Sequence, residues 1–214
     1  MQLRRFAATV ALVLVAGPIQ AQVTPAGTFG SLPPNSFGGS GIPTNAVMLG
    51  AGVGGVVMGL SATPRYTSPP LTNDGAGTFF AVAGPSTGGP SNAGFAAWNF
   101  DYYVGNNPGY LFFLLVDIDP AVGNAASTML HFTLNGNPFD SSNLGYIPGF
   151  DPNAPGEYSF ELSQIGAFGV VDRVAINVQV GTTVTPEPAA MTLLGTGLFA
   201  VAGVVRRRKY ARTS

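Results

Sequence analysis

The sequence predicts an all-β protein, an antiparallel β-sandwich or jelly roll. In several segments apolar residues alternate with polar ones at a period of two, which is typical of strands with one buried face. Glycine and proline number 30 and 18 among 214 residues, and both favour turns and short strands over long helices. Clusters of Asn, Asp, Gly and Pro separate the alternating segments, at intervals that suit a sandwich.

The alternation is clearest over residues 157–163, where Tyr158, Phe160 and Leu162 share one face and polar residues share the other. Residues 110–116 are apolar throughout, so we expect a strand that is covered on both faces.

Residues 128–135 also alternate, and we expect Leu130, Phe132 and Leu134 to face inward. The eight predicted strands, in chain order, are residues 46–49, 56–63, 78–83, 95–104, 110–116, 128–135, 157–163 and 173–180.

The first 21 residues are expected to form a cleaved signal peptide. Arg4 and Arg5 precede an uncharged stretch over residues 6–17, and Pro18 and small Ala21 follow it. The alternative is an N-terminal membrane anchor, but twelve residues make only about 18 Å of helix, short of a hydrocarbon core of roughly 30 Å. We therefore expect export through the Sec machinery.

The last 29 residues, 186–214, combine three elements in a fixed order. A Pro-Glu-Pro sequence comes first, and uncharged residues 189–205 could form a transmembrane helix of about 25 Å. A basic cluster follows, which would stay cytoplasmic by the positive-inside rule and leave the body outside. The residues of this predicted sorting signal are Pro186, Glu187, Pro188, Arg206, Arg207, Arg208 and Lys209.

This tail resembles the PEP-CTERM sorting signal. The resemblance implies processing near the Pro-Glu-Pro by an exosortase, in a Gram-negative bacterium that makes exopolysaccharide. It also implies a transient stay in the inner membrane with the body in the periplasm, and then a place at the cell surface or in the extracellular matrix. The alternative is a simple tail anchor. Residues 22–185 would form the exported domain, whose stretches 38–43, 62–66, 73–79 and 149–153 are similar to an uncharacterised group of such proteins with no known activity.

The charge of this body limits its partners. Residues 22–185 contain nine acidic side chains but only two basic ones, Arg65 and Arg173, which gives a formal charge of −7. Such a surface repels phosphate backbones, so nucleic-acid binding is not expected. The chain has no cysteine, which excludes disulfides and thiolate zinc sites.

Two motifs look catalytic but lack the context that their chemistry needs. Residues 84–88 match G-x-S-x-G around Ser86, with Asp117 and His131 later in the chain, yet the glycines and proline that follow cannot form the required helix. Residues 50–55 match G-x-G-x-x-G, but a strand rather than a helix is expected next, which indicates a glycine-rich hairpin. We therefore expect no enzyme.

Two ligand sites are candidates. Asp117 and Asp119 project to the same side of a strand end and could hold Ca²⁺, joined by Asp140 and Asp151 only if the fold brings those loops together. The alternative is that they begin a turn. Trp98 and Tyr102 share a strand face and could stack on sugars, but core packing explains the same spacing.

These features predict an exported cell-envelope or matrix protein of unknown molecular activity, structural or adhesive in an exopolysaccharide context. A glycan- or calcium-binding module is the alternative, and a secreted hydrolase is a remote one. No cofactor is expected apart from Ca²⁺.

Overall fold

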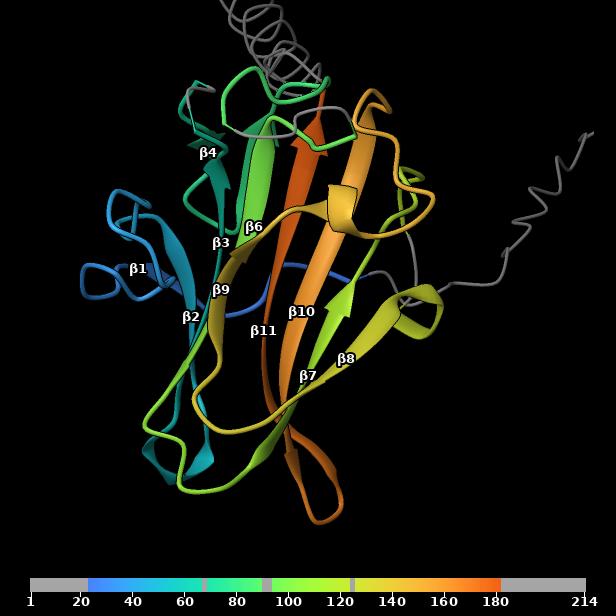
Figure 1. Cartoon of the computed structure of the whole chain (residues 1–214). Coiled ribbons are helices and arrows are strands. Elements are labelled where there is room, and N and C mark those ends of the chain that lie inside the picture. Colours follow the sequence, from blue (N-terminus) through green and yellow to red (C-terminus); the bar gives the residue numbers. More distant parts are fainter. Residues whose placement is uncertain (1–22, 67–68, 90–93, 124–125, 182–214) are drawn as a thin grey trace, which may run out of the picture.

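The computed structural model of the chain describes residues 23–66, 69–89, 94–123 and 126–181. Two β-sheets pack face to face (Figure 1), and the described residues contain no α-helix. None of these residues forms a helix with the length and apolarity to cross a membrane. The predicted signal peptide and sorting signal lie outside the described residues.

The first sheet has five strands in the order β1-β2-β3-β6-β9, and every neighbouring pair is antiparallel. A glycine-containing turn, η1 (Val53–Gly55), joins β2 to β3, so the predicted glycine-rich hairpin is confirmed. The strands are β1 (Thr28–Gly30), β2 (Val47–Ala51), β3 (Val57–Pro64), β6 (Trp98–Gly105) and β9 (Phe139–Ser142).

The second sheet has six strands in the order β4-β5-β11-β10-β7-β8. Its β5 and β11 pair in parallel, so the prediction of a wholly antiparallel sandwich is wrong at this one pairing. Periodicity shows which face a residue occupies and carries no information on strand direction. The strands are β4 (Thr72–Asn73), β5 (Thr78–Ala81), β7 (Leu111–Val116), β8 (Leu130–Leu134), β10 (Gly156–Gly166) and β11 (Gly169–Val180).

All eight predicted strands are present, with ends shifted by a few residues. The three strands that the sequence did not indicate are β1, β4 and β9, which have 3, 2 and 4 residues. Each of them lies at an edge of its sheet. Short edge strands have one unpaired side and need little apolar alternation, so their sequences resemble turns.

The main core lies between the two sheets and is rich in aromatic rings. Trp98 of β6 is 2% exposed and packs against Tyr158 and Phe160 of β10, with ring centroids 5.8 and 6.1 Å away. Phe100 stacks on Phe160 at 4.7 Å. The inward-facing residues of 157–163 are therefore those that the alternation predicted.

Smaller apolar clusters cover part of the outer face of each sheet. Leu115 of β7 packs with Val23, Met129 and Ala175, opposite the main core, which confirms the expectation that this strand is covered on both faces. On the first sheet, Leu32 and Phe37 from the segment between β1 and β2 pack on Val47.

The N-terminal part of the described chain joins the two sheets. Ala26 forms a bridge with Ala175 of β11 through backbone hydrogen bonds of 3.0 and 2.9 Å, and β1 then pairs with β2 of the other sheet. Near the hairpin between β10 and β11, the Gln164 side chain of β10 bonds both the N–H and the C=O of Val53, at 2.8 and 3.0 Å.

One edge of the sandwich is open. The inward face of β8 is only partly covered, and Phe132 at its centre is 42% exposed. Phe132 faces inward as predicted, toward Phe100 and Leu114, but the groove at this edge leaves it partly exposed. Leu130 and Leu134 pack against the rim of the main core.

Candidate functional site: two cavities on opposite faces of the first sheet

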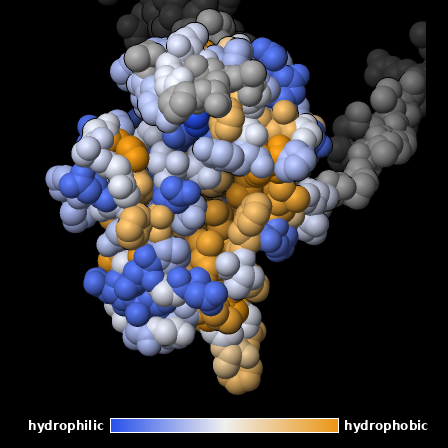
Figure 2. All heavy atoms as spheres, viewed as in Figure 1, coloured by the Kyte–Doolittle hydropathy of each residue, from blue (hydrophilic) through white to orange (hydrophobic). Residues whose placement is uncertain are grey.

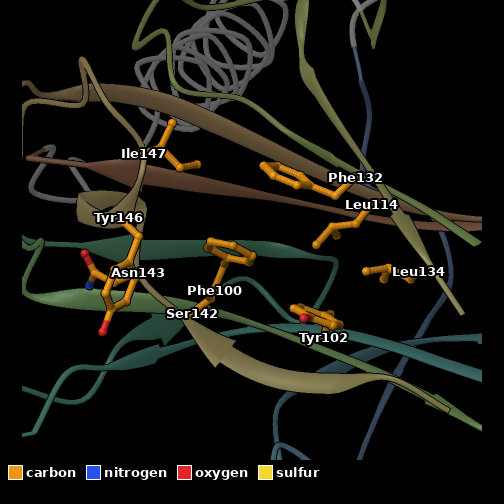
Figure 3. A pocket seen from close by; sticks show the side chains of 9 residues that line it. All are labelled: Phe100, Tyr102, Leu114, Phe132, Leu134, Ser142, Asn143, Tyr146 and Ile147. Atoms are coloured by element: carbon orange, nitrogen blue, oxygen red, sulfur yellow. The ribbon is translucent and has the colours of Figure 1, made fainter. Parts of the chain in front are cut away.

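An apolar groove of about 240 Å³ occupies the open edge between the sheets. Figure 2 shows it as a band of apolar surface between more polar regions. In Figure 3, Phe100 and Tyr102 of β6 point toward Phe132 and Leu114 of the second sheet. The groove is lined by Phe100, Tyr102, Leu114, Phe132, Leu134, Ser142, Asn143, Tyr146 and Ile147.

A second, more polar pocket of about 450 Å³ lies on the outer face of the same sheet. The strand period of two creates this arrangement, since Phe100 and Ser142 line the groove while their neighbours Asn99 and Ser141 line the pocket. One wall comes from residues 39–43, in the segment between β1 and β2. The opposite side contains Thr63, Pro64, Arg65, Tyr66, Asn99, Ser141 and Tyr146.

Arg65 is the one basic residue among those that line this pocket. Its side chain is 7% exposed, and its guanidinium carbon lies 4.4 Å from the ring centroid of Phe95 and 5.0 Å from that of Tyr66. Its Nε is buried without a hydrogen-bond partner. The other basic residue of the body, Arg173, bonds Glu161 at 2.9 Å.

Asp101 lies beneath the polar side chains of the pocket. It is 0% exposed, accepts a hydrogen bond of 3.2 Å from the hydroxyl of Thr63, and interacts with Ser141. Its Oδ2 has no hydrogen-bond partner. Burial raises the pKa of this carboxyl from 3.8 to about 8, and the charge of nearby Asp140 adds to the increase. Asp101 is therefore mainly neutral at pH 7.

Asn143 holds together the elements that separate the two cavities. It is 1% exposed, its amide nitrogen donates to the carbonyl oxygens of Ala96 and Trp98, and its Oδ1 accepts from Ala96 N. The same Oδ1 accepts from Gly145 N and caps η3 (Leu144–Tyr146). This cap positions Tyr146, which lines both cavities.

The predicted sugar-binding residues have different surroundings. Trp98 is 2% exposed within the main core, where it offers no surface for a sugar, so core packing accounts for its place on the strand. Tyr102 is partly buried and lines the apolar groove (Figure 3). A ligand role for Tyr102 stays a prediction.

The predicted calcium ligands lie in a turn. Asp117 is 4% exposed, and its Oδ1 accepts a hydrogen bond of 3.0 Å from Asp119 N, while Asp119 Oδ1 accepts one from Ala121 N. The pKa of Tyr158 is raised to about 12, mainly by burial and further by the negative charges of Asp151, Asp117 and Asp119. Within the described ranges, however, no three acidic, His or Cys side chains are grouped as a metal site requires.

Ser86 and His131, the two residues of the nucleophile motif, lie beside different sheets. Ser86 is 3% exposed, and its hydroxyl donates to the carbonyl oxygen of Gly88 at 3.0 Å within the same bend. His131 is exposed on β8. The backbone N–H of Ser86 donates to the carbonyl oxygen of Phe95 at 2.8 Å, just before β6 of the first sheet, whereas β8 is an edge strand of the second sheet.

Sequence reasoning did not identify Arg65 as a site residue. The available signal was its charge, since Arg65 is one of only two basic residues in the body. Its neighbours Pro64 and Tyr66 carry no motif, and the residues that complete the pocket come from four separate segments of the chain.

Comparison with known proteins identifies a PEP-CTERM protein-sorting motif at residues 184–209. The matched range contains Pro186, Glu187 and Pro188 and the basic cluster at residues 206–209, so the predicted sorting signal is confirmed. The motif implies an exported protein that is processed by an exosortase and is located at the cell surface. No curated protein and no solved structure matches the chain.

Proposed function

We propose that this protein is a non-enzymatic component of the cell envelope or extracellular matrix, with a structural or adhesive role among exopolysaccharides. The observation that carries the proposal is the sorting motif at residues 184–209, which follows directly on a β-sandwich body. The placement of Ser86 and His131 supports a role without catalysis.

The proposed route has three steps. The Sec machinery exports the chain and residues 1–21 are removed. Residues 189–205 then span the inner membrane, with Arg206 to Lys209 on the cytoplasmic side and the body in the periplasm. An exosortase finally acts near Pro186 to Pro188, and the body moves to the surface or the matrix.

The body has features that suit a protein outside the cell. It contains no cysteine, so no disulfide stabilises it and its stability is independent of the redox state of its surroundings. Links between the sheets, such as the Gln164 amide on the Val53 backbone, hold the sandwich together at its ends.

The intact mass of the protein from its native cells tests the route. We expect wild-type protein to lack residues before about 22 and after about 186, because both ends are processed. Glu187→Ala and Pro188→Ala should keep the tail. Arg212→Ala lies outside the matched motif and serves as the control, with wild-type processing expected. A wild-type mass that includes the basic tail would show a plain anchor instead.

Deletion of the gene tests the role. A structural or adhesive component should weaken surface attachment or matrix cohesion when it is removed, and the full-length chain should restore them. Unchanged attachment and cohesion, together with normal processing, would contradict the proposed role and leave the sorting route intact.

A second candidate function is that of a glycan-binding module. The pocket around Arg65 favours it, because a buried cation without a carboxylate partner adjoins exposed aromatic rings there. The calcium alternative has less support, because Asp117 and Asp119 already accept hydrogen bonds from their own turn.

A further inference from the structure

We propose that the pocket between residues 39–43 and the end of β3 binds a saccharide that carries a carboxylate, with Arg65 as the residue that pairs with the carboxylate. The site uses other residues than the predicted Trp98 and Tyr102. The inference goes beyond the proposed envelope role, since it assigns a ligand class and a binding site.

The charge of Arg65 is the first argument. A guanidinium stays protonated at any physiological pH, and burial of such a charge is unfavourable unless it is paired. Arg65 is 7% exposed, and the only salt bridge within the described ranges joins Arg173 to Glu161. The rings of Phe95 and Tyr66 stabilise the cation in part, but the buried Nε of Arg65 has no hydrogen-bond partner.

The net charge of the body makes this arrangement informative. Residues 22–185 contain nine acidic side chains, so the body has enough carboxylates to pair with both of its basic residues, yet no salt bridge to Arg65 is present among the described residues. Asp101, an acidic residue on the same face, is buried and mainly neutral because its pKa is raised to about 8. The planar guanidinium of Arg65, whose Nε has no partner, is suited to bind an external carboxylate in a bidentate manner.

The rim of the pocket supplies aromatic surfaces. Tyr66 and Tyr146 are 60% and 69% exposed, although aromatic rings generally tend to be buried. An edge contact with Phe95, at 4.7 Å between centroids, orients Tyr146. Sugar rings have apolar C–H faces and polar edges, and a tyrosine ring with its hydroxyl group matches both.

The floor supplies neutral polar groups. Thr63, Asn99 and Ser141 line the pocket from three neighbouring strands, and they present hydroxyl and amide groups that can bond sugar hydroxyls. Their positions are fixed by the sheet, and a hydrogen bond of 3.1 Å joins Asn99 Nδ2 to Ser141 Oγ. A volume of about 450 Å³ is in the range of small-ligand sites.

The test is a calorimetric titration of the purified full chain, in a neutral detergent, with trigalacturonate and with its methyl ester. The two probes share the sugar rings and hydroxyls and differ in charge. We expect binding of the acid and a loss of about tenfold or more for the ester. Equal affinity for both probes, or no binding of either, would overturn the inference.

Two substitutions locate the site. Arg65→Gln should weaken binding of trigalacturonate by about tenfold to a hundredfold, because it removes the positive charge and the paired N–H donors of the guanidinium. Arg173→Gln is the matched control, since it removes the other basic charge of the body on the opposite sheet, and it should bind as wild type does. Equal losses in both variants would show long-range attraction and would contradict a site at Arg65.

A third variant covers the case in which Arg65→Gln does not fold. Ser40 is exposed on the pocket wall, so Ser40→Trp should fill the pocket without a change in melting temperature, and it should abolish binding. Wild-type affinity in Ser40→Trp would refute the site. These measurements are independent of cell-surface phenotypes, so a failure of the ligand assignment is distinguishable from a failure of the envelope role.

Discussion

Asp101 and Arg65 lie on the same outer face of the first sheet, and burial affects them in opposite ways. Asp101 can respond by taking up a proton, and its pKa is raised to about 8. A guanidinium cannot lose its proton in a protein, so Arg65 stays charged and depends on the rings of Phe95 and Tyr66 and on whatever enters the pocket.

Asp101 predicts a pH dependence of stability. Below the ordinary pKa of 3.8 the carboxyl is neutral in both the folded and the unfolded protein, and the free energy of unfolding is not reduced by its ionisation. Between that value and about 8 the folded protein keeps a proton that the unfolded chain has released, so the free energy of unfolding falls as the pH rises, by up to about 1.4 kcal/mol per pH unit. Asp101→Asn should remove this loss, so its advantage in melting temperature over wild type should grow from pH 5 to pH 8.

Asp172→Asn, on β11 of the other sheet, is the control for this prediction and should keep the wild-type pH profile. Parallel profiles of Asp101→Asn and wild type would show that the buried carboxyl is not the cause.

At the scale of single elements, the segment around β1 depends on one glycine. Gly27 lies between the Ala26 bridge to the second sheet and β1 in the first sheet, and its φ of +128° is unfavourable for other residues. A Cβ there would lie 2.7 Å from the carbonyl oxygen of Leu49. The glycine therefore lets the chain cross closely from one sheet to the other.

Gly27→Ala should lower the free energy of unfolding by about 2–4 kcal/mol, because it combines backbone strain with a steric clash. Gly109→Ala is the matched control, since its φ is +124° but nothing lies within 4 Å of a Cβ at that position. We expect it to cost about 1 kcal/mol from strain alone. Chemical denaturation of both variants checks the difference, and equal losses would mean that the crossing at Gly27 is not tightly packed.

The elements also show where prediction succeeded. Strands with a buried face, such as β10 and β11, have alternating sequences, and the pattern located them within a few residues. The edge strands β1, β4 and β9 have no such pattern, because few of their residues pack against the core. The parallel pairing of β5 with β11 joins segments about a hundred residues apart, and no local signal describes it.

At the scale of the whole molecule, both sheets share one core, and this predicts cooperative unfolding. Trp98, the single tryptophan, belongs to the first sheet and packs on Tyr158 and Phe160 of the second. Its fluorescence therefore reports on contact between the sheets, while far-UV circular dichroism reports on the strands themselves.

We expect the two signals to give coincident thermal transitions, as a two-state domain does. A Trp98 transition several degrees below the loss of circular dichroism would instead show that the sheets separate before they unfold. The full chain in neutral detergent is suitable for both measurements.

The sequence by itself determined the features that depend on local order along the chain. The eight predicted strands and the inward faces of β6 and β10 follow from periodicity within short windows, and the sorting motif at residues 184–209 is identified by the resemblance of one continuous segment. Such features can be recognised without knowledge of the fold, because they depend on residues that are close together in the chain.

Only the tertiary structure decided which distant residues meet. It buried Trp98 in the core, held Asp117 and Asp119 in their own turn, and brought Arg65 together with Tyr146 across a polar pocket. The physical reason is that burial and pairing depend on contacts between segments far apart in sequence. A side chain of given type therefore becomes core, turn or ligand site according to what the fold places beside it.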